Sequence, residues 1–187
     1  MTPLPLNCVT RAFAAQLCEA LGKSLPSEAQ WEFAARNRTL ESRFPWGDDP
    51  NDCSRTITGR GRTPFELSEG DESDDSCRLQ PDGSLLPPGP VAGGAVGDTS
   101  ALGLRNLSGN VAEWVLDNAV ASTAPCWVAP AGSVLQDPVC TGGSTRPGFR
   151  GGGYDDVPSL SFSAARNSAT LDAGFPDVGF RCVTPGP

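Results

Sequence analysis

Glycine and proline are the residues that most constrain how this chain can fold. They account for 22 and 18 of its 187 residues, respectively. Both disfavour the interiors of helices and sheets, because glycine loses the most backbone entropy on ordering and proline lacks an N–H donor. The sequence therefore predicts a few short regular elements joined by long irregular connections. Its length fits one domain, and its 38% apolar residues are enough for a core.

The chain contains seven cysteines and no histidine. The lack of histidine excludes the usual histidine-containing zinc and non-haem iron sites, and it excludes catalysis by an imidazole base. No Cys-x-x-Cys pair of the zinc-ribbon type is present, so disulfides are the expected use of the cysteines. Two local pairings follow from the spacing: Cys53 with Cys77 across part of a long connection, and Cys126 with Cys140 around a small loop.

The cysteines and the N-terminus point to different compartments. Disulfides indicate an oxidising compartment, whereas residues 1–8 contain neither the charged leader nor the apolar core of a signal peptide. Either the chain is a fragment of a longer exported protein, or it stays reduced inside the cell. The compartment is left open, and the odd number of cysteines leaves at least one thiol unpaired within the chain.

The charge of the chain disfavours two classes of partner. Its formal charge is −8 and its pI is about 4.5, whereas a surface for nucleic acid or anionic lipid needs clustered lysine and arginine. No apolar run approaches the 18 residues that a membrane span requires. The acidic run Glu66–Asp75 is interpreted as a solvated loop, because Ser76 stands where an EF-hand loop needs glycine.

Two helices are expected in the first 40 residues. The first covers Arg11–Leu21, with Thr10 as its cap, and places Phe13, Leu17 and Leu21 on one face. The second begins after Ser27, which forms a capping box with Gln30. Its inner side is expected to carry Trp31, Ala34 and Ala35, and its surface an ion pair between Glu32 and Arg36. Short strands are expected near residues 111–115, 149–154, 162–166 and 178–183.

The stretch Asn106–Trp114 contains oxygen donors at a spacing that suits a hard cation. The Asn106 amide, the Gly109 and Val111 carbonyls and the Glu113 carboxylate would form part of a calcium shell, which takes about 6–8 oxygens. The alternative is a tight turn leading into a strand, with Glu113 facing solvent. The spacing matches no regular calcium-loop motif, so on the residues alone the turn is the simpler interpretation.

Four blocks of sequence, taken in order, resemble the formylglycine-generating enzyme family, also called sulfatase-modifying factors. The blocks are Leu25–Arg36, Phe44–Asp48, Gly109–Trp114, and Arg150–Gly152 followed by Gly179–Cys182. The resemblance implies an α+β, loop-rich variant of the C-type-lectin fold over residues 5–184, with 185–187 as a tail. Family domains normally continue further in the N-terminal direction, so a truncated domain is expected, with the missing N-terminal half as a candidate partner.

The resemblance also assigns metal and disulfide residues. It implies structural calcium at Asn106, Gly109, Val111 and Glu113, and a disulfide between Cys18 and Cys182. A second family disulfide falls at Ala35 and Ser163, where both cysteines are missing. Cys8 is interpreted as half of a bridge whose other half lies in the absent N-terminal part.

The oxidase chemistry of the family uses copper held by two cysteine thiolates, and these are missing here. The matching segment, residues 151–166, contains no cysteine. Gly153 replaces a serine, and Asp156 stands in place of the first thiolate, so Gly153, Tyr154, Asp155 and Asp156 form a degenerate active site. Carboxylates are hard ligands that hold copper(I) poorly, so copper is not expected. An iron-dependent branch of the family needs histidines, which the chain lacks.

The sequence therefore favours a non-catalytic, calcium-stabilised binding or scaffold module. Its loops 48–100 and 117–148 would display a surface for a protein or peptide ligand. Asp155 and Asp156 are a further hypothetical site, for a cationic group. One alternative is an oxidase that works through an altered site or within a larger assembly, and another is a decayed fragment that does not fold alone.

Overall fold

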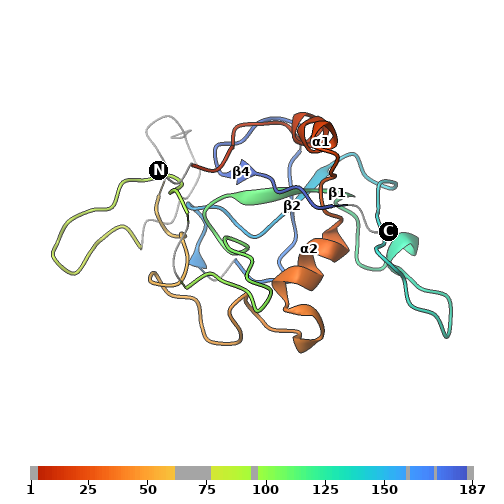
Figure 1. Cartoon of the computed structure of the whole chain (residues 1–187), viewed down its shortest axis with the longest axis horizontal. Helices are drawn as coiled ribbons and strands as arrows, with labels where there is room; N and C mark the ends of the chain where they lie inside the picture. Colours follow the sequence, from red (N-terminus) through yellow and green to blue (C-terminus); the bar gives the residue numbers. More distant parts are fainter. Residues whose placement is uncertain (1–3, 62–76, 94–96, 159–160, 171, 185–187) are drawn as a thin grey trace.

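The computed structural model describes residues 4–61, 77–93, 97–158, 161–170 and 172–184. Within these ranges two helices and a small sheet are joined by long loops (Figure 1). This confirms the expected α+β, loop-rich architecture. None of the helices in the described ranges is long and apolar enough to span a membrane.

Helix α1, Arg11–Ala20, begins at the predicted cap, where the Thr10 hydroxyl accepts a hydrogen bond from the Phe13 amide at 3.1 Å. Its buried residues are Ala14 and Cys18. The expected apolar face was wrong, because Phe13 and Leu21 are 48% and 63% exposed. Small side chains on the inner face bring the helix close to the sheet, and Cys18 ties it to the end of the chain by a disulfide.

Helix α2, Glu28–Ala35, begins with the predicted capping box. The Ser27 hydroxyl accepts from the Gln30 amide at 3.1 Å, and the Gln30 side chain accepts from the Ser27 amide at 3.0 Å. Trp31 and Ala35 are buried, as expected from their spacing. A short 3₁₀ helix, η1, follows at Arg38–Leu40.

The sheet has the strand order β3-β2-β1-β4. Its longest strand is β1, Ala112–Asn118, which pairs antiparallel with β2, Pro147–Arg150, and parallel with β4, Val178–Gly179. Strand β3, Asn167–Ser168, pairs antiparallel with β2. A second 3₁₀ helix, η2, spans Pro125–Trp127 in the loop after β1.

Three of the expected strands differ from those observed. Strand β2 ends at Arg150 because Gly151 and Gly152 adopt φ of +95° and +72°, which turns the chain away from the sheet. No strand forms at described residues within 162–166, and the pairing begins instead at Asn167. The last strand is limited to Val178–Gly179, after which Val183 forms a bridge with Ser24 in the connection between the two helices.

Strand β1 is buried on both faces, and the two helices pack on opposite sides of it (Figure 1). Ala112 and Trp114 join the cluster around α1, together with Val178. Val115 joins the cluster that contains Trp31 and Ala35 of α2. The alternation follows from the two-residue repeat of a strand, which places odd and even residues of β1 on different helices.

The structure contains three disulfides, Cys18–Cys182, Cys53–Cys77 and Cys126–Cys140. They are the three pairs expected from the sequence and the resemblance. Cys8 is the free cysteine, and it is exposed. The first bridge closes a loop of 164 residues and the third a loop of 14, so the former constrains the unfolded chain more strongly.

Candidate functional site

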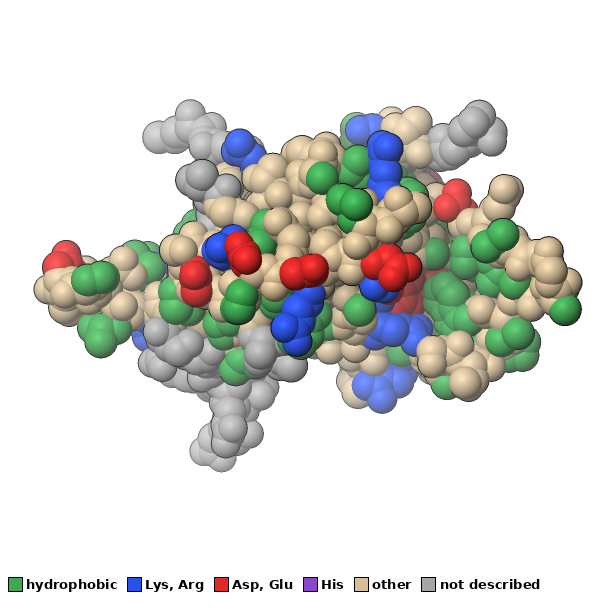
Figure 2. Space-filling view, turned by 90° about the horizontal axis from the view of Figure 1, so that it is seen from below, with side chains coloured by type: hydrophobic (Ala, Val, Ile, Leu, Met, Phe, Trp, Pro, Cys, Tyr) green, Lys and Arg blue, Asp and Glu red, His purple; other side chains and the backbone are tan. Residues whose placement is uncertain are grey.

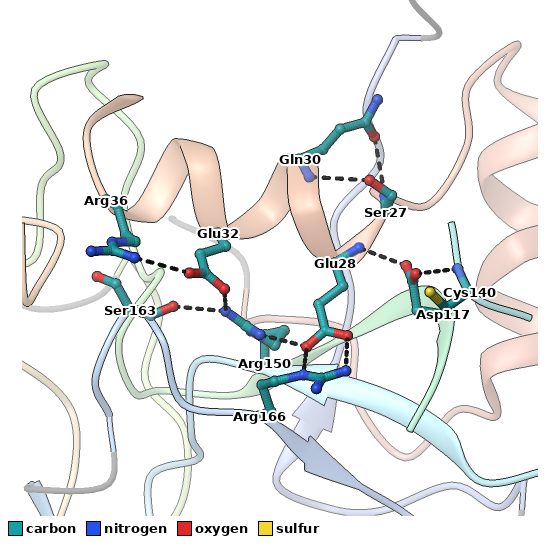
Figure 3. A network of polar contacts seen from close by, with 10 residues as sticks. All are labelled: Ser27, Glu28, Gln30, Glu32, Arg36, Asp117, Cys140, Arg150, Ser163 and Arg166. Atoms are coloured by element: carbon teal, nitrogen blue, oxygen red, sulfur yellow. Dashed lines mark hydrogen bonds and ion pairs between the residues drawn. The ribbon is translucent and has the colours of Figure 1, made fainter. Parts of the chain in front are cut away.

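A buried ion network connects helix α2 to the sheet and to the segment after the degenerate site (Figure 3). Its centre is Arg150 at the end of β2, which is 0% exposed. The Arg150 guanidinium donates to Glu28 Oε1 at 2.5 Å and to Glu32 Oε2 at 2.7 Å. It also donates to the carbonyl of Ser163 at 2.8 Å and lies over the Trp31 ring. Glu28 and Glu32 are one helical turn apart, so both carboxylates face the same guanidinium.

A second arginine completes this network. Arg166 donates to both oxygens of Glu28. Burial disfavours the charged form of Glu28, but the hydrogen bonds and charges of Arg166 and Arg150 outweigh it and lower the pKa of this carboxyl. Asp117 of β1 accepts from the backbone amides of Glu28 and Cys140, each at 2.6 Å, and burial raises the pKa of its carboxyl.

The position of the absent second family disulfide is occupied by a hydrogen bond. The Ser163 hydroxyl donates to the carbonyl of Ala35 at 3.1 Å, and both residues are buried. The two positions are thus adjacent, as the resemblance implies, and a polar contact joins them. The predicted surface pair is also present, since Arg36 Nη1 lies 3.2 Å from Glu32 Oε1.

Two of the four residues expected to bind calcium, Glu113 and Asn106, lie beside an arginine. The Glu113 carboxylate accepts from Arg181 Nη2 at 2.5 Å and Nε at 2.6 Å, and from the Trp31 indole at 2.7 Å. Arg181 Nη2 also donates to the backbone carbonyls of Arg105 at 3.0 Å and Asn106 at 3.3 Å. The structure therefore brings Glu113 and the Asn106 backbone together on one guanidinium. Glu113 is buried, which excludes the alternative in which it faces solvent.

A further carboxylate, Asp98, lies close to this group and was not anticipated from the sequence. It is 1% exposed, its Oδ2 accepts from the Ser108 amide at 3.0 Å, and its Oδ1 has no hydrogen-bond partner among the described residues. Burial raises the pKa of Asp98 to about 7 and outweighs the hydrogen bond from Ser108, which lowers it; the nearby charge of Glu113 raises the pKa further, and that of Arg181 lowers it. Asp98 stands in none of the four sequence blocks, so no pattern marked it.

The charges of Asp98, Glu113 and Arg181 determine whether this region can accept a cation. Asp98 and Glu113 together carry two negative charges when ionised, and Arg181 supplies one positive charge. One negative charge then remains inside the protein, and a buried charge is costly unless a cation or a proton neutralises it. A proton on Asp98 would neutralise it, and so would a cation, but a calcium ion bound here would share Glu113 with Arg181.

The degenerate active site is a tight turn. Asp156 accepts a hydrogen bond from the Gly153 amide at 2.8 Å, and its backbone carbonyl accepts from Gly59. Tyr154 is fully buried, and Asp155 and Asp156 are half-buried. A Cβ atom added at Gly153 would lie 2.8 Å from Cβ of Asp177, so a serine at this position would force the neighbouring chain to move.

The thiols of the chain do not form a copper(I) site. Six cysteines are in disulfides, and Cys8 is the remaining thiol. Its backbone amide is bound to the carbonyl of Phe175, and residues 151–166 offer no second sulfur. A single thiol does not provide the two thiolates of the family's copper site.

Comparison with known proteins identifies the family. Residues 2–185 match the family model described as a sulfatase-modifying factor enzyme 1-like domain. Because that match covers nearly the whole chain, the protein belongs to this family, as its sequence blocks predicted.

Several relatives carry names that describe activity or its absence. The chain is 33% identical over 170 residues to a formylglycine-generating enzyme of Streptomyces coelicolor, a match that covers 87% of this chain and 46% of the relative. It is 29% identical over 188 residues to an inactive C-alpha-formylglycine-generating enzyme 2 of Mus musculus, covering 97% and 49%, respectively. The chain thus spans about half the length of these relatives.

Two solved structures share the fold. Treponema denticola variable protein 1 superposes with a TM-score of 0.57 at 16% identity, covering 95% of this chain and 69% of that one. PvdO from Pseudomonas aeruginosa superposes with a TM-score of 0.55 at 24% identity, covering 94% and 60%. At these identities the likeness concerns the fold alone.

The buried network predicts a large effect of removing its central cation. Replacing Arg150 by Met leaves Glu28 and Glu32 without their shared partner, and we expect the free energy of unfolding to fall by about 3–5 kcal/mol in denaturant titrations. The exposed Arg146, directly before β2, provides the control, and R146M should change stability by less than about 0.5 kcal/mol. Equal effects of the two substitutions would contradict this role of Arg150.

Asp98 predicts a specific dependence of stability on pH. Its pKa is raised from 3.8 to about 7 on folding, so the folded state holds this proton more tightly and stability falls as pH rises from about 4 to 7. In the presence of a calcium chelator, the parent protein should lose on the order of 3 kcal/mol of unfolding free energy across this pH range, and D98N should not show this loss. Denaturant titrations of both proteins at several pH values measure the difference. Parallel pH profiles for the two proteins would contradict a raised pKa of Asp98 in the folded state.

Proposed function

We propose that this chain is a non-catalytic binding or scaffold domain of the formylglycine-generating enzyme family. The observation that carries the proposal is the degenerate site, where residues 151–166 provide no thiolate and the turn at Gly153 has no room for a serine. The existence of relatives that are named inactive shows that such members occur. With the redox centre absent, what remains is a rigid framework that presents long loops, a common arrangement for binding.

Calcium at Asn106, Gly109, Val111 and Glu113 is part of this proposal. The one buried negative charge that remains when Asp98 and Glu113 are both ionised beside Arg181 supports a cation in this region. Calcium would neutralise that charge and tie the turn at Asn106 to strand β1. Its role here is structural, because no reacting group is assigned to this region.

The alternative is an oxidase that generates formylglycine within a larger assembly. The feature that favours it is the 33% identity to a formylglycine-generating enzyme, of which this chain spans less than half. In that case the thiolates would have to come from another polypeptide or from a part of the protein outside this chain.

A conversion assay separates the two functions. A peptide containing Cys-x-Pro-x-Arg is incubated with the purified chain, copper(I) and oxygen, and its mass is compared with that from a metal-only sample. We expect no aldehyde above the metal-only level, because a two-thiolate copper site is missing. An active member of the family serves as the positive control. Aldehyde formed by this chain alone would overturn the non-catalytic assignment.

The calcium proposal predicts stabilisation by the ion. At about 100 times the dissociation constant, calcium should raise the free energy of unfolding by about 2.7 kcal/mol relative to a chelator. The variant E113Q should lose this increment, whereas E41Q, at an exposed glutamate away from the donors, should keep it. An unchanged stability of the parent protein in calcium and in chelator would contradict a structural calcium.

A further inference from the structure

A hollow of about 460 Å³ lies between the outer face of helix α2 and the loop that follows β1. One wall is formed by Ala29 and Phe33 of the helix, and the opposite wall by Trp127, Leu135 and Pro138. None of the degenerate-site residues Gly153 to Asp156 lines it. We refer to this hollow as the α2 groove. Its volume and its largely apolar walls are typical of sites for small ligands.

At the floor of the α2 groove the oxygens of Glu28 and Glu32 are occupied, whereas two arginines at its floor and rim have unused donors. Both oxygens of Glu28 and both of Glu32 already accept hydrogen bonds from arginines. Arg38 lines the groove and has no ion pair or hydrogen bond within the described residues. The Nη1 atom of Arg166 is likewise without a hydrogen bond in the described part of the chain. Free guanidinium donors prefer an anionic acceptor, and a carboxylate matches their planar geometry.

The charge around the groove agrees with this preference. Three arginines and three glutamates line it, and the buried Arg150 behind them adds a further positive charge. The buried Asp117, which lies against Glu28 and acts on the Arg166 charge, balances the charge of Arg150, so the groove is close to neutral, in contrast to the net −8 of the whole chain. In Figure 2 acidic and basic side chains alternate along the face seen from below, and apolar side chains gather over the loop at the right. An anion is therefore better tolerated at the groove than over most of this protein.

The rim of the α2 groove is held in an unusual backbone conformation. Asn37, Arg38 and Glu41 all have positive φ, of 56°, 64° and 53°. Asn37 maintains the turn from inside, because its side chain donates to Ser42 and to the Pro45 carbonyl and accepts from the Ala101 amide. Residues in this region cost about 1–3 kcal/mol each and tend to cluster at functional sites. Here the strain positions the unpaired Arg38 at the rim.

The opposite wall is also fixed in place. Trp127 belongs to η2, next to the Cys126–Cys140 disulfide, and the guanidinium of Arg166 lies 5.5 Å from the centre of its ring. Arg166 is held in turn by both oxygens of Glu28. Helix α2, the arginine floor and the aromatic wall thus form one preorganised unit, which lowers the entropic cost of binding.

We propose that the α2 groove binds an organic carboxylate with an aromatic or branched apolar body. The body would pack between Phe33 and Trp127, and the carboxylate would take the free donors of Arg38 at the rim. This proposal rests on the binding role argued above and specifies its location and ligand chemistry. Such a group can be a free small molecule or the C-terminal residue of a peptide, and the two sources share the same chemistry.

Binding is measured by following the indole N–H signal of Trp127 in ¹⁵N-labelled protein, assigned with W127F. The probes are N-acetyl-phenylalanine, its amide, and the peptide Ala-Ala-Ala-Phe with a free or an amidated C-terminus. We expect N-acetyl-phenylalanine to shift this signal with a Kd of about 1 mM, and the amide to bind at least about fivefold more weakly. Tighter binding of the free-acid peptide would assign the site to a peptide C-terminus, and tighter binding of the small acid would assign it to a free metabolite.

Two substitutions at exposed groove residues test the assignment without disturbing the core. R38Q should weaken binding of the acid by about fivefold and leave the amide unchanged, whereas R146Q, at an exposed arginine outside the groove, should have no effect. F33S should weaken both probes, whereas F13S, at an equally exposed phenylalanine on α1, should weaken neither. Equal binding of acid and amide, or no shift of the Trp127 signal at about 10 mM probe, would overturn the proposal. Neither result bears on the conversion assay, which tests the non-catalytic assignment separately.

Discussion

The buried ion pairs of Arg150 with Glu28 and Glu32 are the interaction on which most of the structure depends. The Arg150 side chain is completely buried, and it is acceptable there only because Glu28, Glu32 and the Ser163 carbonyl surround it. A buried ion pair of this kind adds little net stability compared with an apolar packing, but the loss of one partner is costly. The pair therefore acts mainly by specifying position: it determines where α2 lies against β2 and where the chain after the degenerate site returns to the helix.

The position of α2 then determines two other features. Trp31 reaches Glu113 on β1, which is also bound by Arg181 from the last segment of the chain. On its other side the same helix provides Phe33 and the arginine floor of the α2 groove. Strand β1 lies between these regions and is buried on both faces, so the helices, the sheet and the C-terminal segment form one interlocked unit. This arrangement explains how a chain with so little regular structure keeps a defined shape.

Much of this architecture could be predicted from the sequence, because local chemistry determines it. The caps Thr10 and Ser27 marked the helix starts, and the cysteine positions together with the family resemblance indicated all three disulfides. The buried face of α1 could not be predicted from hydrophobicity, because close packing and a disulfide favour Ala14 and Cys18 over Phe13. Asp98 and the α2 groove were also missed. Both depend on contacts between segments far apart in the sequence, and neither leaves a periodic pattern.

The chain belongs to a family whose named members include enzymes, but its own site lacks the thiolates of their chemistry. Particular residues account for this difference. The framework blocks are intact, since Arg150 joins β2 to helix α2 and Glu113 joins β1 to Arg181 of the C-terminal segment. The segment that should supply the thiolates instead forms a turn closed by Asp156. We therefore propose that the chain is a family framework in which residues 151–166 no longer provide the copper-binding thiolates.

The most direct test of this interpretation is a copper(I) competition experiment. The chain carrying C8S, with its three disulfides intact, is titrated into a complex of copper(I) with a chromogenic chelator under anaerobic conditions. The account predicts that copper(I) stays with the chelator, because no thiolate remains, whereas an active family member withdraws it. Stoichiometric transfer of copper(I) to the C8S chain would contradict the account and would mean that this protein holds a copper site of a different kind.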